Sequence, residues 1–236
     1  MDFDLELVNA SLEKAQTEDV LRWTLETFPN EIAMSSSFQT QSIPLLHIIA
    51  STLPQLPVLF LDTGYHFPDT IAFRDHLAQI WDLNLVILRA EPGQDDSIHQ
   101  GSRPLYLTNP DMCCSLRKVD PMRRAVARYR AWISGIRRDQ AASRANARVV
   151  EVMEDRRVRI HPMINWTQQD IQRYIAEHNL PEHPLSARGY TSIGCAPCTR
   201  PPLAGGGLRS GRWTDSGKTE CGLHSTLRDS AKEIKK

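Results

Sequence analysis

Residues 31–49, EIAMSSSFQTQSIPLLHII, predict the first unit of the fold. The short apolar run from Glu31 to Met34 is typical of a buried strand, and the polar run 35–42 is typical of a loop. The apolar residues from Ile43 to Ile49 then recur at helical spacing. A strand that leads through a loop into a helix is the building unit of a parallel sheet.

The same alternation continues on both sides of this unit. The pattern predicts strands over Leu56 to Leu61, Leu83 to Leu88 and Ala131 to Ile136, with a further, edge strand over Val158 to Ile160. It also predicts two short amphipathic helices within residues 5–28, a helix over Pro68 to Trp81, a helical run after Cys114, and a helix from Thr167, as N-cap with Asp170, through to His178. Strands alternating with helices predict an α/β protein with a doubly wound, mostly parallel sheet.

The character of the chain changes after Pro181. Residues 181–222 are rich in proline, glycine, serine and arginine, and no sustained periodicity runs through them. We therefore predict an α/β domain over residues 1–200 and a flexible C-terminal tail over residues 201–236.

Composition excludes several classes of partner. Twenty-eight basic residues balance 28 acidic ones among 236, so no overall charge attracts the chain to nucleic acid or to an anionic membrane. Residues 1–14 lack the apolar core of a signal peptide, and the longest apolar runs are too short to span a bilayer. Five cysteines are too few for a disulfide scaffold. We expect a cytoplasmic protein with neither nucleic acid nor membrane as a partner.

Polar residues follow two of the predicted strands. Ser35, Ser36 and Ser37 follow the first, and Asp62 follows the next, where the carboxyl ends of parallel strands bind ligands. A serine N-cap explains the serines alone, and a turn explains Asp62 with Gly64 alone, but the two together favour a nucleotide site. The serine loop has neither the glycines nor the lysine of a Walker loop, which argues against an NTP hydrolase.

Cationic side chains recur near the same strand ends and in the predicted tail. Guanidinium and ammonium groups bind phosphate and sulfate, although a solvated surface position is the ordinary explanation of each one alone. The candidates are Lys118, Arg137, Arg138, Arg144, Arg209 and Arg212. The doublet Arg137-Arg138, at the end of a predicted strand, is the strongest of them.

The five cysteines form two pairs and one single residue. The pair Cys195-Ala-Pro-Cys198 alone is compatible with half a zinc site, half an iron-sulfur site or a redox disulfide. The adjacent Cys113 and Cys114 raise the number of thiolates to four, which suits zinc or a cubane cluster. Neighbouring residues on a helix point about 100° apart, so binding of both to one centre implies a helix end or a local distortion.

Cys221 stands outside this quartet, in the segment Glu220-Cys-Gly-Leu-His224. A thiolate near histidine or arginine is the attacking form of cysteine. Neither a Ser-His-Asp elbow nor an H-E-x-x-H motif offers other chemistry in the sequence. Cys221 is therefore the candidate nucleophile.

These motifs together resemble the phosphoadenylyl- and adenylylsulfate reductases of assimilatory sulfate reduction. The resemblance runs from about Glu31 onward and rests on the segments Ser35–Phe38, Leu61–Gly64, Cys113–Lys118, Ser134–Arg138, Gly194–Thr199 and Glu220–His224. The quartet is similar to that of the cluster-bearing branch, which typically uses adenylylsulfate. The resemblance implies an adenine nucleotide alpha hydrolase-like (PP-loop) fold, with Gln39 where many relatives have glycine.

The resemblance also implies a set of roles. Cys113, Cys114, Cys195 and Cys198 would ligate one 4Fe-4S cluster per subunit, acting by electrostatics and by positioning Lys118. Cys221, with His224, would attack the sulfur of the substrate, and thioredoxin or a similar dithiol would release sulfite on the route to cysteine. Lys118, Arg209, Arg212 and His224 would hold the phosphosulfate. The serine loop, Asp62 and the 134–138 segment, which contains Gly135, Arg137 and Arg138, would hold the adenosine phosphate. A homo-oligomer is compatible with the same resemblance.

Three alternatives stay open at this point. In the first alternative, the substrate is 3′-phosphoadenylylsulfate rather than adenylylsulfate. In the second the chain is a PP-loop sulfur-transfer enzyme such as a tRNA thiolase, although those typically have a Ser-Gly-Gly-x-Asp-Ser loop that residues 35–42 lack. The third is a binding module held together by zinc, without catalysis.

Overall fold

The computed structural model describes residues 3–92, 103–218 and 220–223, and its centre is a six-stranded sheet. The strands lie in the order β3-β2-β1-β4-β6-β5. They are β1 (Ile32–Ser35), β2 (Val58–Leu61), β3 (Leu85–Leu88), β4 (Ala131–Ser134), β5 (Val150–Val152) and β6 (Val158–Ile160). Every neighbouring pair is parallel except β5 with β6. The predicted α/β class and mostly parallel sheet are confirmed.

One strand prediction is wrong in position, because β6 is not at the edge of the sheet. It lies between β4 and β5, with Ile160 paired to Val150 and Arg159 paired to Glu151. The sequence analysis missed β5, since a strand of three residues with a glutamate between two valines has too little periodicity to be recognised.

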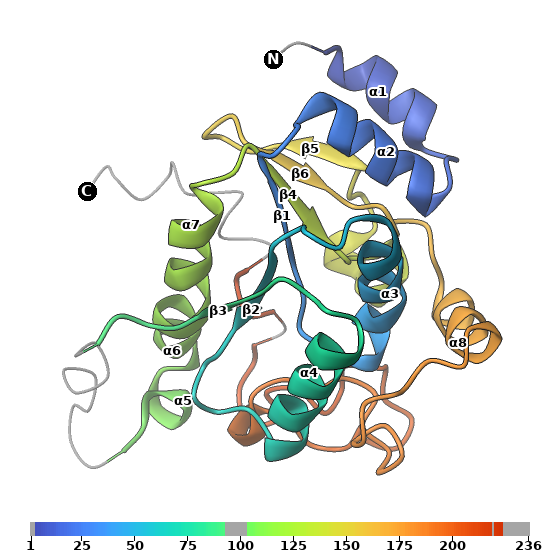
Figure 1. Ribbon diagram of the computed structural model, residues 1–236. Helices are drawn as coiled ribbons and strands as arrows, with labels where there is room; N and C mark the ends of the chain where they lie inside the picture. The colour runs from blue at the N-terminus through green and yellow to red at the C-terminus, as the bar shows by residue number, and fades with distance from the viewer. Residues whose placement is uncertain (1–2, 93–102, 219, 224–236) are drawn as a thin grey trace.

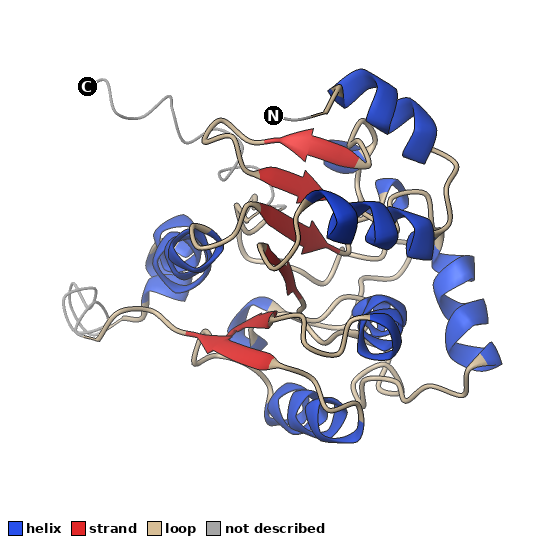
Figure 2. Cartoon of the chain, turned by 45° about the horizontal axis from the view of Figure 1, so that its top comes forward, coloured by secondary structure: helices blue, strands red, loops and turns tan. Residues whose placement is uncertain are grey.

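Helices cover both faces of the sheet. Figure 1 shows α6 and α7 on one side of β2 and β3, with α3, α4 and α8 on the other, and Figure 2 shows the strands running between helical layers. The helices are α1 (Leu5–Leu12), α2 (Thr17–Thr27), α3 (Ile43–Thr52), α4 (Pro68–Ile80), α5 (Leu105–Thr108), α6 (Pro110–Cys114), α7 (Asp120–Val126) and α8 (Gln168–Glu177). The predicted capping box is present at α8, where Thr167 and Asp170 each bond the other's backbone N–H.

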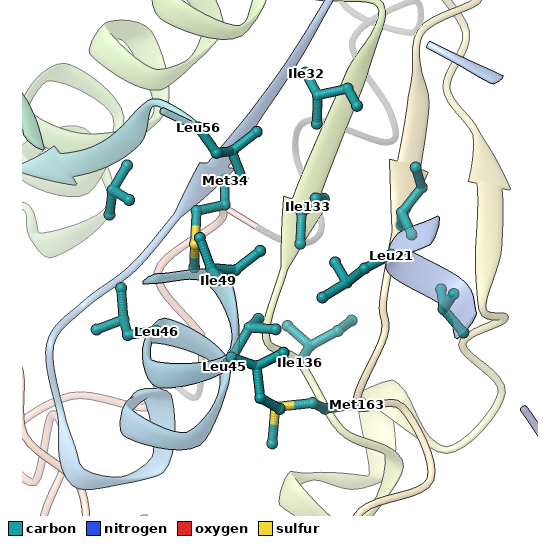
Figure 3. Close-up of a cluster of buried hydrophobic side chains, with 14 of the residues drawn as sticks. Leu21, Ile32, Met34, Leu45, Leu46, Ile49, Leu56, Ile133, Ile136 and Met163 are labelled. Carbon is teal, nitrogen blue, oxygen red and sulfur yellow. The ribbon is translucent and has the colours of Figure 1, made fainter. Parts of the chain in front are cut away.

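Successive strand residues face opposite cores, which explains why the strands are apolar throughout. Met34 of β1 and Ile133 of β4 face the larger cluster, where Leu45 and Ile49 of α3 pack against them (Figure 3). The opposite face of the sheet holds a smaller cluster. Ala33, Leu59 and Trp132 belong to it from the strands and pack with Val119, Met122 and Val126. Each large apolar side chain buried in this way stabilises the fold by about 1.5–3 kcal/mol.

The carboxyl ends of three central strands meet at one edge of the molecule. Ser35, at the end of β1, is paired with Ser134, at the end of β4, and Leu61 ends β2 alongside. The orange-to-red segment that follows α8 crosses the molecule on the side away from α1 and α2 (Figure 1). Among the described residues, no helix is long and apolar enough to cross a membrane.

Candidate active site

A cleft opens where β1, β2 and β4 end. Its walls come from the serine loop at the end of β1, from Leu61 and Thr63 at the end of β2, from Ser134 and Gly135 at the end of β4, and from the C-terminal segment. Of the predicted site residues, those that line the cleft are Ser35, Ser36, Ser37, Lys118, Gly135, Arg144, Arg209, Arg212 and Cys221. Segments from five parts of the chain therefore converge on one site, as expected for a parallel sheet.

The serine loop has a fixed shape because its hydroxyls are bonded. Ser35 Oγ accepts from the indole N–H of Trp132 at 2.8 Å, and Ser36 Oγ accepts from the amide of Phe38 at 3.1 Å. Phe38 has a φ of +54° although it is fully buried, and its ring packs edge-on against Phe60 at 5.6 Å. A non-glycine residue in this region is strained, and such strain is typical of ligand-binding loops.

Gln39 does not require the freedom of a glycine at its position. Its backbone has a φ of −79° and a ψ of 160°, which any residue adopts. Its Oε1 accepts from the amide of Ile193 at 3.0 Å, and the side chain lines the cleft. Gln39 thus ties the serine loop to the segment that precedes Cys195.

Four cations line the cleft: Lys118, Arg144, Arg209 and Arg212. Burial opposes the charged form of Lys118, but the thiolates of Cys195, Cys221 and Cys114 outweigh it and raise the pKa of the ammonium group. Arg212 Nη1 donates to Ser192 Oγ and to the carbonyl of Ile193, both at 3.3 Å. The cleft is therefore suited to a ligand with several negative charges.

Three predicted ligand-binding residues do not line the cleft. Asp62 accepts from Arg89 at 2.9 and 3.0 Å and from the amide of Gly64. Burial raises the pKa of Asp62, but the Gly64 amide and Arg89 outweigh it and lower the pKa overall. Arg137 is fully buried and donates to Asp139, to the carbonyl of Trp166 and to Gln41. Arg138 donates to Glu13 and to the carbonyl of Ala147. His224 lies outside the described residues.

The structure also brings in residues that the sequence analysis did not select: Gln41, Gln140, Trp213 and Glu220 all line the cleft. No spacing or motif distinguishes the two glutamines from ordinary loop residues. Trp213 and Leu223 are 5% and 7% exposed, so these two residues of the predicted tail are buried against the rest of the molecule, whereas residues 203–208 are exposed. The mobility of the tail stays a prediction.

A second, smaller cavity brings the four paired cysteines together. Cys113, Cys114, Cys195 and Cys198 all line it, although the two pairs are about 80 residues apart in sequence. Cys113 and Cys114 end α6, and the chain continues as a π-helical segment, Ser115–Val119. The predicted helix end with local distortion is confirmed, and π-helical turns are frequent at functional sites.

If all four thiols of this cavity were ionised, their negative charges would need a cation to balance them. Burial, reinforced by neighbouring thiolates, raises the pKa of Cys113 to about 12 and that of Cys114 to about 11. Cys195 differs, because Lys118 and the hydroxyl of Thr63, 3.3 Å from its sulfur, outweigh burial and lower its pKa. A sulfur-ligated metal centre would supply the missing positive charge, so the four donors are chemically suited to one.

The two cavities share a wall. Thr63, Lys118 and Trp213 line both of them, and the amide of Trp213 donates to the carbonyl of Cys198 at 3.1 Å. Arg212 stacks over the Trp213 ring at 4.4 Å. The cavity of the four cysteines and the cations of the cleft are therefore in direct contact.

Comparison with known proteins agrees with this arrangement. Residues 31–201 match the family model described as "Phosphoadenosine phosphosulfate reductase domain". The chain is 42% identical over 220 residues to an adenosine 5′-phosphosulfate reductase of Streptomyces coelicolor, covering 93% of this chain and 92% of that one. The crystal structure of the phosphoadenylyl-sulfate reductase of Candida auris is similar with a TM-score of 0.73 and 28% identity, over 85% of this chain and 99% of that one.

The fold extends to more distant proteins. The crystal structure of Candida glabrata FMN adenylyltransferase is similar with a TM-score of 0.58 at 17% identity, over 80% of this chain and 62% of that one. At this identity only the fold is shared, and the predicted adenine nucleotide alpha hydrolase-like class is confirmed. By its sequence match and its structure, the chain belongs to the phosphoadenosine phosphosulfate reductase family.

Proposed function

We propose that this protein is an adenosine 5′-phosphosulfate reductase, which converts adenylylsulfate to sulfite and AMP. The observation that carries the proposal is a thiol and four cations in one cleft at the strand ends, since Cys221 lines the same cavity as Lys118, Arg144, Arg209 and Arg212. The relative from Streptomyces coelicolor, which covers nearly the whole chain, is named for this activity.

In the proposed first step the sulfur of Cys221 attacks the sulfur of the substrate's sulfate group. The bond between that sulfur and the bridging oxygen breaks, and AMP leaves with the electron pair. Lys118, Arg209 and Arg212 would hold the phosphosulfate and stabilise the charge that develops on the leaving phosphate. The product on the enzyme would be an S-sulfocysteine.

In the second step a dithiol such as thioredoxin regenerates the thiol. One thiolate of the donor attacks Cys221 Sγ, sulfite leaves with the electron pair of the sulfur-sulfur bond, and a mixed disulfide forms. The second thiol of the donor then attacks this disulfide and restores Cys221. The two electrons that reduce the substrate come from the dithiol, which ends as a disulfide.

The adenosine phosphate would lie against the serine loop and Gly135. Ser35 ends β1, Ser36 and Ser37 follow it in the wall of the cleft, and loops at the carboxyl ends of parallel strands bind phosphate groups. Asp62, Arg137 and Arg138 would support the surrounding loops rather than touch the nucleotide, because none of the three lines the cleft and each is held by other protein groups.

We further propose that Cys113, Cys114, Cys195 and Cys198 hold one 4Fe-4S cluster. All four line the second cavity. Adjacent ligands such as Cys113 and Cys114 are unusual for structural zinc, which normally has about two to four residues between its cysteines, and this favours a cubane, in which each cysteine binds a different iron. When bound, the cluster would contribute an electrostatic field beside Lys118 without changing its oxidation state.

The direct test is sulfite release by anaerobically purified protein from adenylylsulfate and from its 3′-phosphorylated form. We expect thioredoxin-dependent activity that favours adenylylsulfate and is abolished in Cys221→Ser. Mass spectrometry of the wild-type protein without reductant should show a sulfonate on Cys221. Formation of a covalent sulfonated enzyme by Cys221→Ser would contradict the mechanism, and faster turnover of the 3′-phosphorylated form would contradict the substrate.

Visible absorption tests the cluster independently of activity. A 4Fe-4S protein is brown, whereas a zinc-thiolate protein is colourless. We expect the colour to be lost in Cys114→Ser and kept in Cys221→Ser, which removes one thiol outside the second cavity. A colourless, zinc-containing wild-type protein would overturn the cluster assignment.

A further inference from the structure

Glu220, the residue before Cys221, is held by two arginines of the cleft. Its carboxylate oxygens accept from Arg144 Nη2 at 3.1 and 3.2 Å, and one of them also accepts from Arg209 Nη2 at 3.2 Å. The side chains of Glu220 and Arg144 are only 18% and 9% exposed. An ion pair with so little contact with water is stronger than a surface pair.

Arg144 is in turn fixed to the body of the molecule through a chain of hydrogen bonds. Its Nη1 donates to Gln140 Oε1, and Gln140 Nε2 donates to Gln41 Oε1 at 3.1 Å. Gln41 Oε1 also accepts from Nη1 of the fully buried Arg137 at 3.0 Å. Arg144, one of the two arginines that hold Glu220, is thus anchored beside the serine loop, whereas Arg209 belongs to the C-terminal segment.

Cys221 lies between this ionic contact and an apolar one. Leu223, two residues further on, is 7% exposed and belongs to the cluster that contains Met122 and Trp132. Cys221 itself packs against the same cluster. Two anchors of different chemistry therefore flank the thiol, and Glu220 is the one that points to the cations.

We propose that Glu220 is a positioning residue that holds Cys221 in the cleft by its ion pairs with Arg144 and Arg209. This inference rests on the proposed function, because it takes Cys221 as the nucleophile. The same carboxylate offsets positive charge that an anionic nucleotide also attracts. Glu220 therefore favours attack by Cys221 while it weakens the binding of the nucleotide.

Loss of this carboxylate is expected to slow the attack by Cys221 and to keep or strengthen nucleotide binding. This combination distinguishes a positioning role of Glu220 from a merely structural one. In Glu220→Gln the Cys221 segment loses its charged anchor, so sulfonation of Cys221 in a single turnover should slow by about tenfold or more. The arginines lose a compensating charge, so the affinity for AMP should stay the same or rise, by up to about fivefold. A damaged fold would lower both quantities.

The experiment compares anaerobically purified full-length wild-type protein, Glu220→Gln, Glu220→Asp and the control Glu154→Gln. Glu154 is exposed in the turn between β5 and β6 and does not line the cleft. Single-turnover formation of S-sulfocysteine is followed by mass spectrometry, and AMP affinity is measured by calorimetry. Glu220→Asp, which keeps the charge, should recover part of the rate, and Glu154→Gln should match the wild type.

Slower sulfonation with AMP affinity kept or raised supports the proposal. Sulfonation of Glu220→Gln at the wild-type rate, or a fall in both sulfonation and AMP affinity, overturns it. If the wild-type protein itself forms no S-sulfocysteine at Cys221, the proposed function has failed. If the wild-type protein forms it and only the expected difference in Glu220→Gln is missing, the role of Glu220 has failed.

Discussion

The indole Nε1 of Trp132 donates a hydrogen bond to Ser35 Oγ at 2.8 Å. Trp132 is a core residue of β4, only 1% exposed, and Ser35 is the first residue of the proposed phosphate loop at the end of β1. The hydrogen bond therefore joins a side chain of the core to a residue that lines the cleft. Core packing and loop geometry are linked at this point.

Trp132→Phe should remove this link while keeping an aromatic ring in the core. We expect the free energy of unfolding to fall by about 1–3 kcal/mol, from the lost hydrogen bond and the smaller ring. The KM for adenylylsulfate should rise, with a smaller change in kcat, because Ser35 loses its fixed orientation. Steady-state kinetics and urea unfolding check both parts.

The control is Trp81→Phe, because Trp81 does not line the cleft. An unchanged KM in Trp132→Phe would contradict the link between Trp132 and the phosphate loop.

Gly194 leaves no space for a side chain, because a Cβ there would overlap the Arg212 guanidinium group. Gly194→Ala should push Arg212 away from Ser192 and Ile193 and lower kcat/KM by about tenfold or more. Gly207→Ala is the matched control, since a Cβ at Gly207 meets nothing within 4 Å and the residue has no left-handed backbone. Equal activity of the two variants would show that the position of Arg212 is unimportant.

The sequence predicts that Arg138 binds the nucleotide, whereas the structure shows its guanidinium group bonded to other protein groups. Its guanidinium group bonds Glu13 at 3.1 Å and the carbonyl of Ala147 at 2.8 Å, away from the cleft. Arg138→Ala should lower the free energy of unfolding by about 1–2 kcal/mol and leave the KM for adenylylsulfate within about twofold of wild type. Arg22→Ala, at an exposed ion pair, is the stability control. A large rise in KM for Arg138→Ala would restore its predicted role in binding.

His183 predicts how stability depends on pH. It is 1% exposed; its Nδ1 accepts from the amide of Leu185 at 3.1 Å, so Nε2 carries the hydrogen and donates to Thr70 Oγ1 at 2.9 Å. Burial lowers the pKa of His183 to about 4, against the opposing effect of Asp69. In the unfolded chain the pKa is about 6.5, so the unfolded state takes up the proton first. The stability that neutral His183 contributes above pH 6.5 is lost as pH falls toward 4.

Urea unfolding between pH 5 and pH 7.5 measures how the free energy of unfolding changes with pH. The change is expected as pH falls through the window from about 6.5 to about 4 that the two pKa values define. His183→Asn should be less stable than wild type at neutral pH, and its stability should fall less steeply on acidification. His76→Asn, at an exposed position, should retain the wild-type slope. Parallel curves for the wild type and His183→Asn would show that His183 is not the group responsible.

The sequence by itself determined the alternation of strands and helices and the grouping of the five cysteines into two pairs and one single residue. Both are local properties, because hydrophobic periodicity and residue spacing are written along the chain. The distortion after Cys114 also followed from local geometry, since two adjacent residues on a regular helix point in different directions. The position of β6 and the existence of β5 did not, because three-residue strands depend on the neighbours with which they pair.

Only the tertiary structure decided which polar side chains enter the cleft. Arg137 and Arg138 have the right charge at the right strand end, yet neither lines the cleft, while Arg144 and Glu220, 76 residues apart, form an ion pair inside it. A side chain's direction follows from which partners surround it after folding, and those partners come from distant parts of the chain. Sequence therefore identified the chemistry of this protein, and packing assigned it to particular residues.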